Sequence, residues 1–311
     1  MDVGNVRAVL ARKGLSAAEV ARRIRYDAAY LSRVLNGRQA PSAALQRSLT
    51  ELLDLDEDDE RTEYVMLHPT RLDRAAVDAL AGALAAQRRA DDVVGPMPLL
   101  PAAETHRTVL LGLLSHARGP ERDALAEVVA EHCAFLGWLH VQMRSDRAVS
   151  VLREGEQIAR EIGSGPLIAQ SRNFLACHWR TRGDHRQAAQ HFDAVTRTEG
   201  VHLTQRAANT ARAAEQTAKA GDKTAARTLL RAAERLGERA ANQTPPEAAY
   251  WLRGQAFQLL NQGIAHAAIG DEKTAREHIA AGLAGVAAEH LSAPWISDYV
   301  SPGQLRELSP L

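Results

Sequence analysis

Apolar residues recur every three to four positions along almost the whole chain, and this helical period is the feature that most restricts its fold. The periodic segments run for about 12–22 residues, with glycine, proline or aspartate between them. No β-branched or aromatic stretch alternates with the two-residue period of a strand. We therefore expect an all-α protein, and 311 residues with 45% hydrophobic content supply enough apolar surface for a buried core.

Breaks in the pattern divide the chain into three expected parts. Residues 1–65 form a small N-terminal helical domain, residues 66–101 a linker, and residues 102–311 a long helical domain. The linker holds one helix over about Leu72–Arg89, followed by three prolines between Gly95 and Pro101. These prolines predict a break, because proline removes a backbone donor and restrains the residue before it.

Charge is distributed unevenly along the chain, although the 38 basic and 38 acidic side chains cancel. The first 53 residues carry nine basic and four acidic side chains, a net charge of +5. Asp54–Glu63 carries seven acids and one arginine, a net charge of −6, which we interpret as a solvated loop, and the remainder is close to neutral. A nucleic-acid partner would therefore contact the first 53 residues.

Composition disfavours several classes of protein. No apolar run approaches the roughly 18 residues of a membrane span, and the first residues lack the apolar core of a signal peptide. Two cysteines, 44 positions apart, do not make a disulfide framework. We expect a soluble, cytoplasmic protein with no membrane partner.

Capping signals predict two short helices joined by a tight turn in the N-terminal domain. Ser16 and Glu19 have the spacing of a capping box, and Asp27 opens a second helix that ends at Asn36–Gly37. The second helix has a small and polar outer face, the arrangement that reads a major groove. The expected core residues are Val6, Val9, Leu10, Val20, Ala21, Ile24, Leu31, Val34, Leu35, Leu45, Leu49 and Leu52.

Five short motifs stand at characteristic spacings in this domain: Gly14-Leu15-Ser16, Glu19-Val20-Ala21, Tyr30-Leu31-Ser32-Arg33, Asn36-Gly37-Arg38 and Pro41-Ser42. On these motifs, Val6–Leu55 resembles the lambda-repressor-like helix-turn-helix domain of the XRE type. The resemblance implies that Asp27–Leu35 is a recognition helix for double-stranded DNA. Because one small domain makes few contacts, we expect a homodimer on an inverted repeat. The chain departs from the family pattern at Ala17, where glutamine is usual, and at Arg25, where glycine is usual.

The resemblance assigns eight residues to DNA contact. Ala28, Ala29, Tyr30 and Arg33 would lie at base edges, where arginine contacts guanine with two bonds and an alanine methyl meets a thymine methyl. Ser32, Asn36 and Arg38 would lie near phosphates, where they hold the register. Ser16, at the start of the preceding helix, is the eighth DNA-binding residue. The alternative is that the individual side chains are ordinary surface residues.

Three Gly-Asp pairs divide the C-terminal half into helix pairs. An alanine follows each aspartate after four residues and an apolar residue follows after eight, as in Asp184, Ala188 and Phe192. Helix pairs bury their apolar faces by stacking, so we expect a helical-repeat solenoid. The small-residue positions resemble degenerate tetratricopeptide repeats, and the segment before them resembles that of actinobacterial XRE regulators at Asp91-Asp92, Gly95-Pro96 and Gly137-Trp138-Leu139. The other copies are Gly221-Asp222 with Ala226 and Leu230, Gly270-Asp271 with Ala275 and Ile279, and an earlier one at Arg144, Ala148 and Leu152.

A stack of this kind presents an inner surface made by the first helix of each pair, and polar residues there predict a ligand groove. Asn173, Asn209 and Asn261 lie 11, 13 and 10 residues before their turn aspartates, so we place them at one level of the groove. Since asparagine amides pair with a peptide backbone, the expected effector is a peptide or a small molecule. The alternative is that each amide is solvated or satisfied within the core. The candidate ligand-binding residues are Arg172, Asn173, Asn209, Arg212, Gln258 and Asn261, with His140 and His266 as further polar residues.

The chain shows no pattern that predicts catalysis or a metal site. His132-Cys133 and Cys177-His178 are adjacent pairs of soft ligands, but neighbouring residues of a helix point about 100° apart and rarely reach one metal. No His-Glu-x-x-His, phosphate-binding loop or Gly-x-Ser-x-Gly motif is present. We therefore expect no cofactor, no metal and no enzymatic activity.

The function expected on these grounds is sequence-specific DNA binding by a transcriptional regulator whose helical repeats dimerise or sense a signal. The competing hypothesis is a protein-interaction adaptor, in which the repeats bind a protein partner and the N-terminal domain lacks operator specificity. Ala17 and the alanine-rich start of the second helix favour that alternative.

Overall fold

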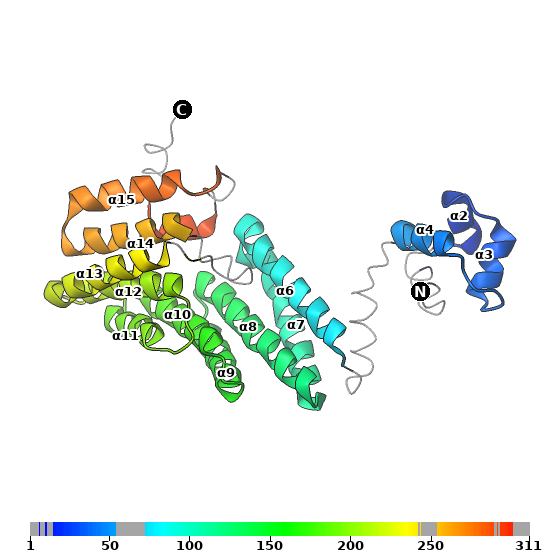
Figure 1. The fold of residues 1–311 in the computed structure, drawn as a ribbon, viewed down its shortest axis with the longest axis horizontal. Coiled ribbons are helices and arrows are strands. Elements are labelled where there is room, and N and C mark those ends of the chain that lie inside the picture. The colour runs from blue at the N-terminus through cyan, green and yellow to red at the C-terminus, as the bar shows by residue number, and fades with distance from the viewer. Residues whose placement is uncertain are drawn as a thin grey trace. The chain divides into compact units, whose positions relative to one another are not determined.

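The computed structural model describes residues 15–53, 72–241, 254–288 and 293–300, together with Val6, Leu10, Gln243 and Leu291. Thirteen α-helices and one 3-10 helix make up the regular structure of these residues, which contain no strand (Figure 1). The expected all-α fold is therefore confirmed. The chain divides into two compact units, Met1–Leu80 and Ala81–Leu311.

The N-terminal unit places α2 (Ala17–Arg23), α3 (Ala28–Leu35) and α4 (Ala43–Leu53) around one apolar core. Nine residues expected in the core are buried there: Val6, Leu10, Val20, Ala21, Leu31, Val34, Leu35, Leu45 and Leu49. Ile24 and Leu52 pack against them and are partly buried. Val9, Gly14 and the acidic run Asp54–Glu63 lie outside the described residues.

The second unit is a succession of helices in which each helix from α7 to α15 packs against the next one. The division between the two units falls within α6 (Arg74–Val94). The helices that follow are α7 (Pro96–His116), α8 (Pro120–Gln142), α9 (Arg147–Glu161), α10 (Gly165–Thr181), α11 (His185–Thr196), α12 (Leu203–Lys219), α13 (Lys223–Ala240), α14 (Gly254–Ile269), α15 (Glu272–Ala284) and the 3-10 helix η4 (Pro294–Asp298).

The Gly-Asp turns separate the helices of three pairs, as the sequence predicted. Each turn glycine has a positive φ and each turn aspartate accepts a hydrogen bond from the backbone N–H three residues later; the turns are Gly183-Asp184, Gly221-Asp222 and Gly270-Asp271. Arg144 adopts the same left-handed conformation, with a φ of 53°, in the turn between α8 and α9. The alanines of the pattern, Ala148, Ala188, Ala226 and Ala275, are buried.

The predicted break lies in the proline-rich segment, but it is confined to one residue and the prolines themselves are helical. Only Gly95, with a φ of 74°, interrupts the helices, since α7 begins at Pro96 and continues through Pro101. Pro96 and Pro98 fall in the first turn of α7, where proline is tolerated because the N–H groups have no partner within the helix, whereas Pro101 lies inside the helix. The preceding helix begins two residues later than expected and runs five residues further, to Val94.

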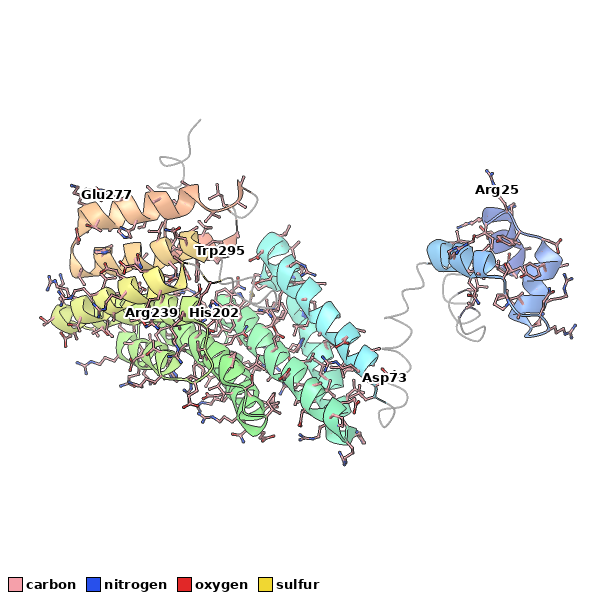
Figure 2. The ribbon with its side chains drawn as sticks, viewed as in Figure 1. Arg25, Asp73, His202, Arg239, Glu277 and Trp295 are labelled. Atoms are coloured by element: carbon pink, nitrogen blue, oxygen red, sulfur yellow. The ribbon has the colours of Figure 1, made fainter. Side chains whose placement is uncertain are left out.

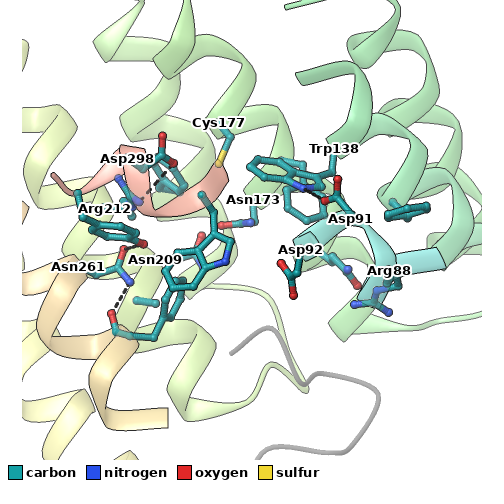
Figure 3. Close-up of a pocket in the computed structure, with 18 residues that line it drawn as sticks. Arg88, Asp91, Asp92, Trp138, Asn173, Cys177, Asn209, Arg212, Asn261 and Asp298 are labelled. Atoms are coloured by element: carbon teal, nitrogen blue, oxygen red, sulfur yellow. Dashed lines mark hydrogen bonds and ion pairs between the residues drawn. The ribbon is translucent and has the colours of Figure 1, made fainter. Parts of the chain in front are cut away.

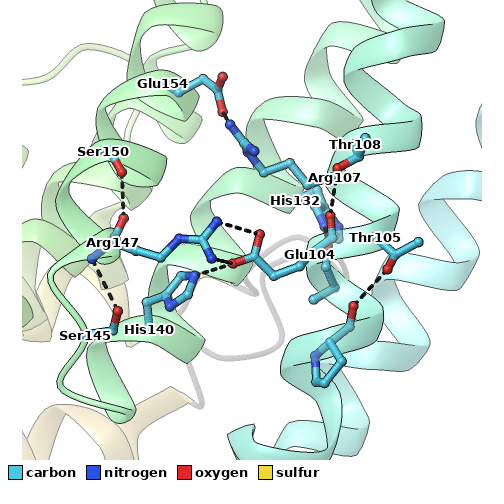
Figure 4. A network of polar contacts seen from close by, with 12 residues as sticks. Glu104, Thr105, Arg107, Thr108, His132, His140, Ser145, Arg147, Ser150 and Glu154 are labelled. Atoms are coloured by element: carbon cyan, nitrogen blue, oxygen red, sulfur yellow. Dashed lines mark hydrogen bonds and ion pairs between the residues drawn. The ribbon is translucent and has the colours of Figure 1, made fainter.

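A polar network ties α7 to α8 and α9 (Figure 4). The Glu104 carboxylate accepts from Nε2 of buried His140 at 2.9 Å and pairs with Arg147 at 2.9 Å. One turn further along α7, the Arg107 guanidinium pairs with Glu154 of α9 at 2.5 Å. Burial lowers the pKa of His140 below its ordinary value, although Glu104 acts in the opposite direction. These contacts fix the first helices of the unit against one another.

The last described segment returns to the earlier helices of the unit. Ile296 and Tyr299 are buried against Leu260 and Ile264 of α14, and Trp295 packs beside Phe257. The Asp298 carboxylate accepts from Nη2 of Arg180, in α10, at 2.7 Å. The segment is therefore held by contacts with residues up to 118 positions away in the chain.

Within the described part of the chain, α8 is the one helix that is long and apolar enough to cross a membrane. Its apolar window is 78% buried by the helices around it. Burial of this kind is typical of the central helix of a folded core.

Candidate functional site

The helix-turn-helix of the N-terminal unit is built by local capping bonds. Ser16 Oγ accepts from the Glu19 N–H at 3.2 Å and begins α2, and Asp27 Oδ1 accepts from the Tyr30 N–H at 2.7 Å and begins α3. Between the two helices, Arg25 adopts a φ of 56°, and its side chain points into solvent (Figure 2). Arg25 stands where the XRE pattern has glycine, so the turn keeps the glycine conformation without the glycine.

One face of α3 is exposed, and it carries most of the predicted base-contact residues. Ala28, Ala29, Ser32 and Arg33 are exposed, whereas Leu31, Val34 and Leu35 are buried on the opposite face. Arg33 Nε donates to Gln39 Oε1 at 3.0 Å, which orients the guanidinium. Asn36 and Arg38, the predicted phosphate contacts that follow α3, are exposed as well.

Tyr30 and Ser16 have structural contacts of their own. The Tyr30 ring is half-buried against the core and lies 6.4 Å from the Tyr26 ring, and its hydroxyl accepts from the Ser42 N–H at 3.0 Å. Tyr30 therefore joins α3 to the start of α4. The Ser16 hydroxyl accepts the cap bond, and its own proton is left to donate to another acceptor.

A partly open cavity of about 130 Å³ lies in the second unit, lined by residues of α6, α8, α10, α11, α12, α14 and the segment that includes η4 (Figure 3). Four of the six predicted ligand residues line it: Asn173, Asn209, Arg212 and Asn261. The structure thus brings together the three asparagines that the sequence placed at one level.

Arg172 and Gln258 lie away from this cavity and are used elsewhere. Arg172 donates to Glu156 Oε1 at 2.9 Å and to Thr198 Oγ1 at 3.0 Å. Gln258 is buried, and its Nε2 donates to the Thr204 carbonyl at 2.7 Å. The two further polar residues also have partners in the fold. His140 contacts Glu104, and His266 contacts Asp271 and Glu234.

Arg212 is bound within the protein. Its guanidinium stacks over the Tyr299 ring at 4.6 Å and pairs with Glu215 at 3.3 Å and Asp298 at 3.7 Å. Burial by itself lowers the pKa of Arg212, but Tyr299, Glu215 and Asp298 raise it overall, so the group stays charged. The Tyr299 hydroxyl donates to Asn261 Oδ1 at 3.2 Å. Residues of the C-terminal segment therefore contact two of the predicted ligand residues, Arg212 and Asn261.

The opposite end of the cavity carries functional candidates that the sequence analysis did not select as a site. Asp91 is 7% exposed and accepts from Trp138 Nε1 at 3.0 Å and from Gln142 Nε2 at 3.0 Å. Burial raises the pKa of Asp91 above its ordinary value. Asp92 and Phe174 line the cavity beside them. The signal was the pair of adjacent acids two helices before Gly137-Trp138, which entered the sequence analysis only as part of the family resemblance.

The two cysteines, Cys133 and Cys177, are free thiols in the interior of the second unit. In the part of the chain that the structure describes, no three His, Cys, Asp or Glu side chains are grouped to hold a metal ion. Burial raises the pKa of Cys133 to about 12, and it also raises the pKa of Cys177. Burial therefore disfavours the thiolate, the reactive form of cysteine, at both positions.

Comparison with known proteins identifies one region of the chain. Residues 6–63 match a family model described as a helix-turn-helix domain. No curated protein and no solved structure matches the chain. The matched residues include α2, α3 and α4, so the N-terminal unit carries a helix-turn-helix domain, a DNA-binding element.

Proposed function

We propose that this protein is a sequence-specific transcriptional regulator of the XRE type, acting in the cytoplasm, in which α3 reads the major groove of double-stranded DNA. The observation that carries the proposal is the exposed face of α3, where small residues stand beside an oriented arginine. Ala28 and Ala29 permit close approach to base edges, and Arg33 supplies a bidentate donor for guanine. Ser16, Ser32, Asn36 and Arg38 would hold the phosphates, and Tyr30 would act at the rim of the base contacts.

The second unit is proposed to serve as the dimerisation and sensor domain, built from tetratricopeptide-like helix pairs. A single helix-turn-helix contacts few base pairs, so two-fold pairing on an inverted repeat with half-sites roughly 34 Å apart would supply the missing affinity. The cavity lined by Asn173, Asn209 and Asn261 is the proposed effector site. No catalytic step is assigned to the chain.

Substitution of Arg33 tests the recognition helix. We expect Arg33→Ala to weaken binding to the operator by about 1–3 kcal/mol and to relax preference at one base position. Arg38→Ala should weaken binding to all sequences alike and reduce its dependence on salt. The measurement is a salt-dependent shift assay on DNA from the upstream region of the gene.

Arg186→Ala, which removes an exposed arginine from α11 in the other unit, is the matched control and should leave affinity unchanged. Intact operator affinity in Arg33→Ala would show that α3 is not the reading helix.

The second candidate function is an interaction adaptor, which Ala17 favours because the position offers no side-chain hydrogen bond to a phosphate. In that case the same assay would give equal affinity for all DNA fragments. Discrimination of at least about a thousandfold between one fragment and the rest, as specific binders show, would favour the regulator.

A further inference from the structure

The loop that joins α3 to α4 is held at its first end by the way in which α3 stops. Gly37 follows the helix with a φ of 67°, in the left-handed region. Its N–H donates to the Val34 carbonyl, and the N–H of Arg38 donates to the Arg33 carbonyl, both at 2.9 Å. These two bonds form a Schellman motif, which turns the chain back over the end of the helix. The residue after the motif, Gln39, therefore returns beside Arg33.

The second end of the loop is held at the start of α4. The Ser42 N–H donates to the Tyr30 hydroxyl at 3.0 Å, and Ser42 Oγ accepts from the Leu45 N–H at 3.2 Å. The Tyr30 ring packs against the core of the N-terminal unit. Between the two ends, Pro41 has a fixed φ and restricts the residue before it. Gln39 therefore stands on a short loop that is anchored on both sides.

The Arg33 side chain is bound at one atom and open at the others. Its Nε donates to Gln39 Oε1 at 3.0 Å, and no contact among the described residues engages Nη1 or Nη2. Because the guanidinium is planar, a bond at Nε fixes the direction in which the two Nη groups point. Two parallel N–H donors at the end of an arginine match the O6 and N7 acceptors of guanine.

A bond that is present before DNA arrives changes which base Arg33 prefers. An exposed arginine gives up rotamer freedom when it binds a base, and a side chain that is already oriented gives up less. A base that does not fit the oriented fork either breaks the bond to Gln39 or leaves donors without partners. Exclusion of water from the interface increases both penalties, because hydrogen bonds are stronger in a low dielectric.

We propose that Gln39 is a positioning residue that sets a preference for guanine through Arg33, with the anchored α3–α4 loop as its support. Gln39 acts on the base through the guanidinium and not by a contact of its own. The inference rests on the proposed function, in which α3 reads the major groove, and it adds the residue that selects the base.

The test is selection of the full-length chain on a pool of randomised double-stranded DNA, with sequencing of the bound fraction. Arg33→Ala identifies the base position that Arg33 reads, because the preference for guanine is lost there. Gln39→Leu, which replaces the amide by an apolar side chain of similar size, should reduce that preference by about three- to tenfold and leave the other positions unchanged.

Gln39→Glu keeps an acceptor oxygen for Arg33 Nε and should retain the preference. Its added negative charge weakens binding to all sequences alike, which the ratio of guanine to the other bases does not register. In an Arg33→Ala background, Gln39→Leu should have no further effect. Gln190→Leu, at an exposed glutamine of α11 in the other unit, is the matched control and should change nothing.

Far-UV circular dichroism confirms that each variant is folded, and Gln39 is exposed, so its replacement leaves the core intact. An unchanged guanine preference in Gln39→Leu, an equal loss at all positions, a further loss in the Arg33→Ala background, or failure of Gln39→Glu to retain the preference would each overturn the inference. Failure of the proposed function has a different signature, since Arg33→Ala would then alter no base position.

Discussion

Among the described residues, Arg25 and Arg144 are the two that hold a left-handed backbone conformation without being glycine. For a residue with a Cβ atom this conformation costs roughly 1–2 kcal/mol. The Arg25 side chain is exposed and does not offset this cost, so the packing of α2 and α3 must impose the turn. The geometry of the helix-turn-helix is therefore set by its core more than by its turn residue.

Arg25→Gly should stabilise the N-terminal unit by about 0.5–1 kcal/mol, because relief of the left-handed conformation outweighs the greater freedom of glycine in the unfolded chain. Hydrogen exchange of the α2 and α3 amides measures the change. Arg25→Ala removes the same charge but keeps a Cβ atom, so it should give no such gain. Equal protection in both variants would show that the turn is not strained.

His132 predicts a loss of stability on acidification. Its Nε2 donates to the Ala103 carbonyl at 2.8 Å, and burial lowers its pKa from 6.5 to about 4. Between these two values the unfolded chain binds a proton that the folded chain does not, so stability falls as the pH drops from 6.5 and the loss is complete below 4. The expected contribution is about 3 kcal/mol.

Urea unfolding at several pH values measures this loss, and His132→Gln supplies the comparison because an amide donates to Ala103 without titrating. The variant should lose the part of the pH dependence that one proton accounts for. An unchanged slope would mean that His132 is not the group that titrates.

At the scale of elements, local signals were sufficient where a helix end depends on its own residues. Ser16, Asp27 and the three Gly-Asp turns identified helix starts because each cap bond spans three residues. The prolines marked the region of the break correctly but not its extent, because Pro96 falls in a first helical turn, where proline does not interrupt a helix. The start of that helix was set by Gly95.

Asp222→Ala should destabilise the second unit by about 1 kcal/mol, because the bond from the Ala225 N–H to Asp222 Oδ1, 2.9 Å long, caps α13. Asp222 is exposed, so the substitution leaves the core unchanged. Chemical denaturation measures the loss. Asp222→Asn retains the capping oxygen and should restore most of the stability; if it behaved like alanine, the cap would not be the cause.

At the scale of the whole molecule, the order of helices and the shared level of Asn173, Asn209 and Asn261 could be predicted, because both follow from periodicity. The return of the C-terminal segment could not. Asp298 meets Arg180 across 118 positions, and no local pattern indicates a partner at that distance. Arg212 and Asn261 were predicted as ligand residues because the sequence does not indicate that this segment returns. In the structure Tyr299 contacts both of them.

Asp298→Asn should destabilise the second unit by about 2 kcal/mol, because it removes the carboxylate charge that pairs with the largely buried Arg180 and Arg212. Thermal unfolding, followed by tryptophan fluorescence near Trp295, measures the change. Asp193→Asn breaks a comparable pair with Arg197, whose side chain is 70% exposed, and should have almost no effect. Similar losses in the two variants would argue against a special role for the C-terminal contact.

The attachment of η4 to α10 has a consequence for how the second unit comes apart. In a linear array of stacked helix pairs each pair contacts only its neighbours, so the array frays from its ends. Here the last segment contacts α14, α12 and α10, which joins the late pairs to an earlier one. Opening one pair therefore exposes the residues that hold the others, and unfolding should proceed as a single cooperative step. A ligand in the cavity would then stabilise all the helices together, because its binding free energy is linked to that one transition.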